Sequence, residues 1–454
     1  MEALITATQF LLALSILIIL HECGHFWAAR AFGIRVEKFF LFFDAWGFKF
    51  FSFKKGDTEY GIGWLPMGGY VKIAGMVDES LDKEQMNSEP QPWEFRSKPA
   101  WQRLIVMIGG VLVNLILGII ITTVVTYTQG DRYIPNDKIN ELGGIYASPM
   151  ARDFGFKTGD KILKLNGKPV DNLSEEFGSA AFLTASNKVV ELQRDSQIIE
   201  LKLPVNMEDK LGSMTDEQKM YPLFAPRTGF AIETVMAGSN ASKAGLKKND
   251  RIIAIDSVET ASFFEFREML QHSKNKAIKL TVLRGDSVKM DTMKLAAQVT
   301  EDGTLGFQPK DLELEQYVKV VNYTVLQSVV IGSEKSIDLL VGTAQSLGKV
   351  ATGKVNAKKS LAGPVGIAQM FGGEWNWLKF WTLTALLSLT LAFMNILPIP
   401  ALDGGHVMFL LWEMITGKPV TEKVLYVGQI IGMVFILSLM AFAFWVDIAR
   451  ALGF

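Results

Sequence analysis

The sequence predicts an α+β membrane protein with four transmembrane helices, a small membrane-associated β-sheet and two tandem copies of a small soluble domain. Three observations lead to this fold class. Four apolar runs are long enough to cross a bilayer, a glycine-rich stretch follows the first run, and a repeated segment of soluble composition separates the second run from the third. Hydrophobic residues make up 49% of the chain and charged residues 20%, which fits a protein that lies only partly inside a membrane.

Composition also excludes two features. The formal net charge is −1, so no basic field favours a nucleic-acid partner. Cys23 is the single cysteine of the sequence, so we expect no internal disulfide.

The first predicted span covers residues 5–29 and closes a first segment, 1–29. No lysine or arginine precedes it, whereas six follow it by residue 55, so the positive-inside rule places its C-terminal end at the cytoplasmic face. The run resembles a signal peptide in hydrophobicity. It lacks a basic start and an A-x-A cleavage site, so we expect it to be retained.

This span ends in a metal-binding pattern, His21-Glu22-Cys23-Gly24-His25. On a helix with about 100° per residue, His21 and His25 lie one above the other and can ligate one ion, with Glu22 beside them. Imidazole suits zinc, and a neighbouring carboxylate can deprotonate a zinc-bound water. Ionisable groups inside a span are costly unless paired or coordinated, so we predict a zinc site rather than polar residues that only mark the end of the helix.

Residues 30–100 form a second segment on the cytoplasmic side. Residues 59–72 read as short strands with Gly and Pro turns, so we expect a small sheet beside the metal site, whose free edge near Ile62 or Val71 could bind an extended peptide. A plain surface hairpin is the alternative. Residues 76–100, acidic and rich in proline, are expected to form a solvated loop.

The second span covers residues 101–128 and carries one polar residue in its apolar run, Asn114. Its amide could orient a metal-bound water or a substrate carbonyl. A hydrogen bond to a neighbouring helix is an equally good interpretation.

Two similar segments follow, predicted as domains 129–225 and 226–314. Residues 155–167 recur as residues 245–257, each preceded by a small-residue helix start and followed by a pair of alternating strands. The pattern resembles PDZ domains of bacterial proteases, which bind peptides by strand addition. Residues 227–230 are a candidate carboxylate-binding loop, although such domains can also act as steric filters.

Residues 315–375 are predicted to be largely helical. Apolar residues recur at helical spacing between residues 317 and 353, which suits a helix on the membrane surface. A core helix packing on the second repeat is the alternative.

The third span, residues 376–403, ends in a broken polar segment. Pro398 and Pro400 interrupt the helix, and Asp403 follows them directly. A catalytic zinc needs a third protein ligand, and Asp403 is the candidate. The chain crosses the membrane twice, in the second and third spans, between the His21–His25 motif and Asp403. Both therefore lie at the cytoplasmic side. His406 is more readily interpreted as an interfacial or supporting residue than as a ligand. A fourth span lies within residues 404–454.

Taken together, these motifs resemble the site-2 protease family of intramembrane zinc metalloproteases. The resemblance covers nearly the whole chain and implies that His21, His25 and Asp403 ligate Zn²⁺ and that Glu22 is the catalytic base. It also implies roles for other residues. Asn395, Pro398 and Pro400 would shape the turn that accommodates the substrate. Asn114 stands where the family usually has an asparagine in its second span. The residues that carry the resemblance are His21 to His25, residues 59–72, Asn114, the two repeats, residues 361–367 and residues 395–405.

The family resemblance further implies partners and location. We expect substrates to be transmembrane proteins, such as anti-sigma factors after a first cleavage and signal-peptide remnants, in contact with membrane lipid. The expected location is the bacterial cytoplasmic membrane, with the PDZ-like repeats outside the cytoplasm. Two departures concern the substrate: the second span lacks the family's usual proline between Gly110 and Asn114, and residues 39–44 are more aromatic and poorer in glycine than is typical.

Two other functions are possible on the sequence. A catalytically silent PDZ-bearing membrane scaffold would keep its activity in a Glu22→Gln variant, whereas a protease would lose it. A metal transporter would normally need more intramembrane ligands than this chain offers.

Overall fold

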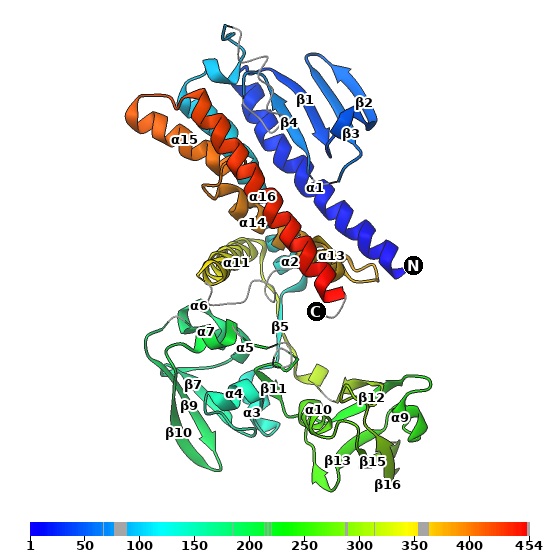
Figure 1. Ribbon diagram of the computed structural model, residues 1–454. Helices are drawn as coiled ribbons and strands as arrows, with labels where there is room; N and C mark the ends of the chain where they lie inside the picture. The colour runs from blue at the N-terminus through cyan, green and yellow to red at the C-terminus, as the bar shows by residue number, and fades with distance from the viewer. Residues whose placement is uncertain are drawn as a thin grey trace. The chain divides into compact units, whose positions relative to one another are not determined.

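The structure, a computed structural model, divides into two compact units. Unit 1 comprises residues 1–130 and 322–454, and unit 2 comprises residues 131–321 (Figure 1). The structure describes residues 1–66, 68–76, 89–183, 185–212, 214–215, 218, 220–286, 289–312, 314–352 and 363–451. Residues 77–88 of the loop expected over residues 76–100 lie outside these ranges, as do Leu361 and Ala362 of the family motif.

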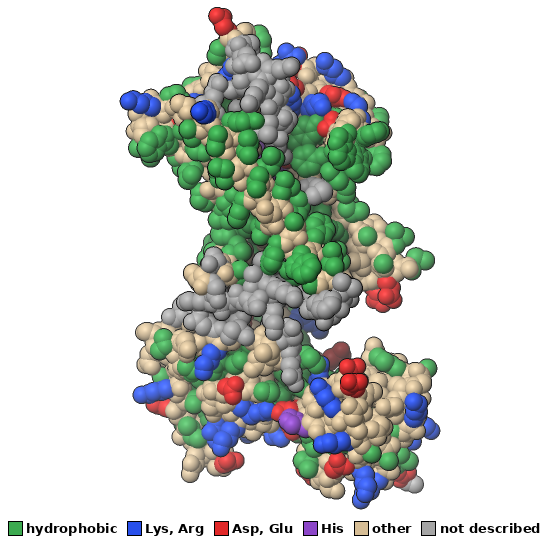
Figure 2. Space-filling view, viewed as in Figure 1, with side chains coloured by type: hydrophobic (Ala, Val, Ile, Leu, Met, Phe, Trp, Pro, Cys, Tyr) green, Lys and Arg blue, Asp and Glu red, His purple; other side chains and the backbone are tan. Residues whose placement is uncertain are grey.

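Among the described residues, unit 1 contains four helices that are long and apolar enough to cross a membrane, as the sequence predicts. They are α1 (Glu2–Ala31), α2 (Ala100–Gln129), α14 (Trp377–Ile396) and α16 (Glu422–Ala451). The other helices of this unit are α11 (Val325–Ala351), α13 (Pro364–Phe371) and α15 (Asp403–Thr416), with 3₁₀ turns at Ala45–Gly47 and Phe95–Ser97. Figure 2 shows hydrophobic side chains over much of the visible face of these helices, whereas charged side chains are scattered over unit 2.

Helix α2 packs against α1, α11, α14 and α15. Its contact with α1 is unusually close, because a Cβ on Gly24 would lie 2.3 Å from the Gly109 carbonyl oxygen and a Cβ on Gly109 would lie 2.6 Å from the Gly24 oxygen. Small residues allow this approach, which is how helices associate where lipid removes the hydrophobic drive between them. The close contact brings the end of α1 that carries His21 and His25 onto α2.

A four-stranded sheet packs against α1. Its strands are β1 (Val36–Leu41), β2 (Lys49–Lys55), β3 (Thr58–Gly63) and β4 (Tyr70–Ile73), in the order β2-β3-β1-β4. The pair β1/β3 is parallel and the other pairs are antiparallel. The expectation of a free edge at Ile62 is wrong, because β3 is paired on both sides. Val71 does lie on an edge strand, β4.

The Gly363-Pro364 part of the family motif forms the start of helix α13. The Asp447 carboxylate of α16 accepts hydrogen bonds from the backbone N–H groups of Gly363, Val365 and Gly366. A Cβ on Gly363 would lie 2.4 Å from both Asp447 Oδ2 and the Ala443 oxygen, so glycine is required there. The predicted helix over 317–353 corresponds to α11, which packs on α2 and α14.

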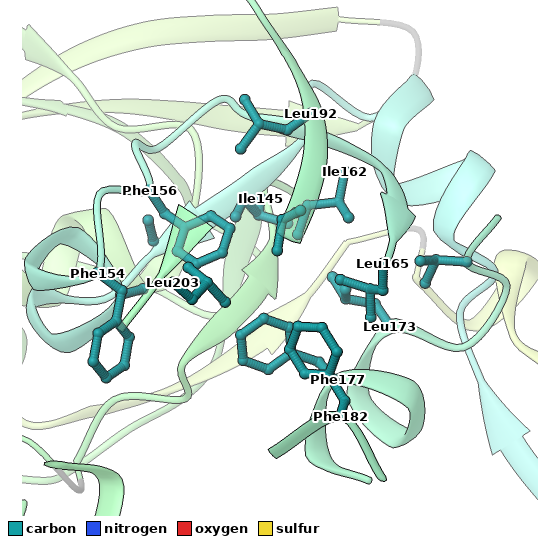
Figure 3. Packing of buried hydrophobic residues seen from close by; sticks show 14 of the residues in the cluster. Ile145, Phe154, Phe156, Ile162, Leu165, Leu173, Phe177, Phe182, Leu192 and Leu203 are labelled. Atoms are coloured by element: carbon teal, nitrogen blue, oxygen red, sulfur yellow. The ribbon is translucent and has the colours of Figure 1, made fainter. Parts of the chain in front are cut away.

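Unit 2 consists of two α+β repeats. It begins with β5 (Asp131–Tyr133) and ends with β18 (Lys319–Val321), and these two strands pair with each other. The first repeat contains strands β6 (Ile145–Ala147), β7 (Lys161–Leu165), β8 (Lys168–Pro169), β9 (Lys188–Arg194), β10 (Gln197–Leu203) and β11 (Phe224–Pro226). Its helices are α3 (Asn136–Glu141), α4 (Pro149–Asp153), α5 (Leu173–Gly178), α6 (Ala180–Leu183) and α7 (Met207–Gly212). Phe156, Phe177 and Ile162 lie in its core (Figure 3).

The second repeat follows the same order. Its strands are β12 (Phe230–Val235), β13 (Arg251–Ile255), β14 (Val258–Glu259), β15 (Ala277–Asp286), β16 (Lys289–Gln298) and β17 (Phe307–Asp311), with helices α9 (Asn240–Lys243) and α10 (Phe263–His272) and a 3₁₀ turn at Leu314–Tyr317. The sheet order is β16-β15-β13-β12-β17, with β14 paired to β13.

One buried ion pair occurs in both repeats. Asp160 is 1% exposed and receives two 2.7 Å hydrogen bonds from Arg194, and Asp250 is bonded in the same way by Arg284. Each arginine also donates to a glycine carbonyl, and each aspartate accepts from a backbone N–H three residues before it. This shared detail establishes the predicted repeat as structural.

The candidate carboxylate-binding loop over residues 227–230 leads into strand β12, which is paired on both sides and so has no free edge for an added peptide strand. The Arg227 guanidinium donates to Glu265 at 2.8 Å, and Phe230 is 1% exposed at the start of β12. Since β12 pairs with β13 and β17, the strand at the edge of this sheet is β17. The alternation of apolar and polar residues and the turn residues predicted the repeat, but they did not predict which strand lies at the edge of the sheet.

Candidate metal centre

The two histidines of the motif occupy the C-terminal part of α1, and Asp403 is the first residue of α15. His25 is 6% exposed, and its ring meets that of His21 edge to face. Asp403 reaches them because the chain turns sharply between α14 and α15. Within that turn Leu402 donates to Ile399 and Ala401 has a φ of +79°, a strained value for a residue other than glycine.

Three ligand-type atoms form a nearly equilateral triangle. The Nε2 atoms of His21 and His25 are 3.3 Å apart, and Asp403 Oδ2 lies 3.3 Å from the first and 3.4 Å from the second. Zinc bonds of about 2.0–2.1 Å in tetrahedral geometry imply ligand atoms about 3.3–3.4 Å from one another. The triangle therefore has the size of one face of a tetrahedral zinc site.

The donor set also fits zinc chemically. Asp403 Oδ2 is buried and has no hydrogen-bond partner among the described residues, although a buried oxygen normally has one. Two imidazole nitrogens and one carboxylate oxygen are a common ligand set of catalytic zinc, which leaves a fourth position for water. Among the described residues, this is the group of His, Cys, Asp and Glu that could hold a metal ion.

Hydrogen bonds orient both imidazoles. His25 Nδ1 lies 2.8 Å from the Val106 carbonyl oxygen, so Nδ1 donates and Nε2 is left to bind metal. His21 Nδ1 lies 3.3 Å from the amide Nδ2 of Asn114, which is 1% exposed and whose Oδ1 has no partner. Rotating this amide by 180° lets Oδ1 accept from His21 Nδ1 and removes the unsatisfied oxygen.

The predicted base, Glu22, lies between α1 and the sheet. The Val71 backbone N–H of strand β4 faces its carboxylate. At Gly69, just before this strand, a Cβ would lie 3.6 Å from Glu22 Cγ and 2.5 Å from Ile18. Glycine there allows β4 to approach the base.

Comparisons with known proteins identify the family of this chain. The model of peptidase family M50 matches residues 9–439. The chain belongs to peptidase family M50. Three relatives are similar over their whole length. The regulator of sigma-E protease RseP of Escherichia coli is 30% identical over 467 residues, covering 97% of this chain and 98% of that protein. Protease RseP of Yersinia pestis is 29% identical over 471 residues, covering 99% and 100%. A Neisseria meningitidis protein whose name contains the words zinc metalloprotease is 30% identical over 469 residues, also covering 99% and 100%.

This M50 peptidase is a zinc-dependent metalloprotease, as the motif and the family predict. Of the predicted site residues, the structure brings together His21, His25, Asp403 and Asn114. The predicted residue Asn395 also lies there, with its Nδ2 3.3 Å from His21 Nε2.

Glu22 adjoins the ligand triangle, whereas Pro398, Pro400 and His406 are not among its members. Pro400 contacts α16, where a Cβ on Gly432 would lie 1.6 Å from the Pro400 oxygen. Pro398 lies in the same turn between α14 and α15. His406, one turn after Asp403, is not part of the metal-binding group.

Sequence reasoning missed two residues of the peptidase site. A Cβ on Gly110 would lie 2.4 Å from His25 Nε2 and 2.6 Å from His21 Cε1, so glycine provides the space for both rings. Its spacing of four residues from Asn114, one helical turn, was a signal that the two share a face of α2. Val106 contributes a backbone carbonyl, which no sequence pattern reveals.

Proposed function

We propose that this M50 peptidase is an intramembrane protease that cleaves transmembrane segments of other membrane proteins, with His21, His25 and Asp403 as zinc ligands and Glu22 as catalytic base. The observation that carries the proposal is the triangle of Nε2, Nε2 and Oδ2 atoms, 3.3–3.4 Å on each side, with both histidines on the candidate membrane-spanning helix α1 and Asp403 at the start of α15. No arrangement of these groups is stable in an apolar setting unless they are coordinated or paired.

The chain's own residues would perform the proton transfers. When bound, zinc would polarise the scissile carbonyl and acidify a water molecule. Glu22 takes a proton from that water and delivers it to the leaving amine. The Val71 N–H, which faces the Glu22 carboxylate, would orient it for both transfers, and the Asn395 amide, next to His21, is placed to donate to the substrate carbonyl.

A substrate helix must unwind before it is cut, since its carbonyls are engaged in its own hydrogen bonds. The edge strand β4 supports binding of the unwound segment as an added strand, because one side of β4 pairs with β1 and its residue Val71 adjoins Glu22. Pro398 and Pro400 would shape the turn that faces this segment. Substrates with helix-breaking residues near the cut should therefore be preferred.

The protein lies in a bacterial cytoplasmic membrane, as its four apolar helices and its relatives indicate. In our proposal the metal centre is near the cytoplasmic face, while the two repeats act outside as PDZ-like domains that admit substrates shortened by an earlier protease. Anti-sigma factors are one such substrate class, given that relatives are named regulators of sigma-E protease. Signal-peptide remnants are a second.

The test uses the full-length protein in lipid vesicles with a model transmembrane substrate. Glu22→Gln should abolish cleavage while keeping about one zinc per chain, and Asp403→Ala should lose both. Cleavage that persists in Glu22→Gln would contradict the proposal. A protein that binds zinc but never cleaves would be the scaffold, and one that moves zinc across the vesicle membrane would be the transporter.

A further inference from the structure

The segment that leads into strand β4 carries few backbone restraints. β4 has four residues, pairs only with β1 among the described strands, and follows Gly68 and Gly69. Glycine gives the preceding chain wide conformational freedom. Tyr70 and Val71 pair with Phe40 and Phe39 of β1, and the side-chain contacts of Tyr70 add to this pairing in holding the start of the strand at Glu22.

The first residue of β4, Tyr70, is anchored by its side chain. Its hydroxyl donates to Asp44 Oδ1 at 2.8 Å, and Lys38 donates to Asp44 Oδ2 at 3.0 Å. The Tyr70 ring stacks on Phe40 with ring centres 5.5 Å apart and on Phe43 with centres 6.0 Å apart. The aromatic contacts fix the plane of the ring, while Asp44 fixes its position along the strand.

Asp44 is itself held in a strained turn at the end of β1. Phe42 has a φ of +67°, which costs energy in a residue other than glycine, and Phe43 pairs with Leu65 in an isolated bridge. Partial burial opposes ionisation of Asp44, but the Tyr70 hydrogen bond and the Lys38 charge lower the pKa of this carboxyl below its usual value. Asp44 is therefore an ionised acceptor at neutral pH.

We propose that Asp44 and Tyr70 are positioning residues for the catalytic base: Asp44 holds Tyr70, and Tyr70 holds the adjacent Val71 N–H against the Glu22 carboxylate. The inference rests on the proposed role of Glu22. It also accounts for residues 39–44, where this sequence departs from the glycine-rich family pattern. The turn that binds Tyr70 here needs an acceptor, which glycine does not provide.

The experiment measures kcat and KM for the reconstituted protein, together with zinc content and hydrogen exchange of the Val71 amide. Asp44→Ala and Tyr70→Phe should each lower kcat about tenfold, because small misplacements of a catalytic group are costly. Zinc content should stay at one per chain, and the Val71 amide should exchange faster. The double variant should also lose about tenfold rather than a hundredfold, since both changes break one interaction.

Two variants complete the test. Asp44→Asn keeps an oxygen that can accept from Tyr70, so it should restore kcat to within about twofold of wild type. Glu59→Gln is the matched control, because it breaks the Lys49–Glu59 pair of the same sheet on the strands away from Glu22. It should leave kcat unchanged.

The inference and the proposed function fail in different ways. Activity in Glu22→Gln, or none in wild type, would overturn the function. An active wild type, an inactive Glu22→Gln and full activity in Asp44→Ala and Tyr70→Phe would overturn the positioning role alone. Effects that multiply in the double variant, or an Asp44→Asn variant as slow as Asp44→Ala, would also overturn it.

Discussion

At the scale of single residues, the metal centre depends on groups that do not touch the metal. His21 and His25 present Nε2 to the ligand triangle because their Nδ1 atoms are turned towards Asn114 and the Val106 carbonyl. Partners of this kind fix the tautomer of a ligand and commonly change metal affinity by about 10–100-fold. Asn114 therefore acts on the metal through His21, a role that its place in an apolar helix did not distinguish from substrate contact.

We predict that Asn114→Leu lowers zinc affinity about tenfold or more, because His21 Nδ1 loses its acceptor. Asn114→Asp should keep wild-type affinity, since a carboxylate oxygen also accepts from Nδ1. Competition with a zinc chelator in detergent measures both. Equal affinities for Asn114→Leu and the wild type would show that the contact does not orient His21.

Gly110 is a second residue with an indirect role. We predict that Gly110→Ala abolishes stoichiometric zinc binding, because the added methyl group would lie 2.4 Å from His25 Nε2. Gly118→Ala on the same helix is the control: its Cβ would lie 2.5 Å from Leu389 Cγ and 3.5 Å from the Ala385 oxygen, and it would meet neither histidine. Metal analysis of the purified variants distinguishes the two. Zinc retained in Gly110→Ala would contradict the geometry.

At the scale of elements, each repeat of unit 2 contains one ion pair whose aspartate is almost completely buried. Asp250 is 1% exposed, and the guanidinium of Arg284 is its charged partner. A buried charge that loses its partner costs about 3–5 kcal/mol, whereas an exposed pair contributes about 1 kcal/mol or less. The pair therefore matters for folding of the repeat and not for catalysis.

We predict that Arg284→Met destabilises the second repeat by about 3–5 kcal/mol and leaves zinc content unchanged. Lys248→Met, which breaks the exposed pair with Glu233, should cost less than about 1 kcal/mol. Hydrogen exchange in strand β13 of the full chain reports both effects. Equal protection in the two variants would refute the difference.

At the scale of the whole molecule, every residue of the metal centre belongs to unit 1, although its parts come from residues 21–25, 110–114 and 395–403. Unit 2 begins with strand β5 and ends with strand β18, where Asp131 pairs directly with Val321. The insertion therefore begins and ends at one place, and its removal requires only a short linker.

We predict that joining Gly130 to Asn322 through a short Gly-Ser linker leaves one zinc per chain. If the repeats filter substrates, the shortened protein should also cleave substrates that still carry a bulky outer domain, several-fold faster than the full chain does. Metal analysis and cleavage of long and short substrates in vesicles test the two parts separately. Loss of zinc would show that the insertion supports the centre.

Much of this protein follows from local sequence. Four apolar runs become the long helices to within a few residues, because a span must satisfy its backbone hydrogen bonds internally and cannot be much shorter. The spacing of His21 and His25 determines that both face one ion, since the period of the helix alone sets it. The period-two alternation and turn residues of the repeats determine their strands in the same way.

Tertiary structure decided what depends on residues far apart in the chain. Only the packing of α15 on α2 brings Asp403 to within 3.3 Å of His21, and only strand order shows that Val71, not Ile62, lies at an edge. The same holds for Gly110, Asn114 and the Asp44–Tyr70 contact. A local pattern fixes the conformation of its own segment, whereas a contact between distant segments is set by the shapes of all the elements that pack together, which no single stretch of sequence contains.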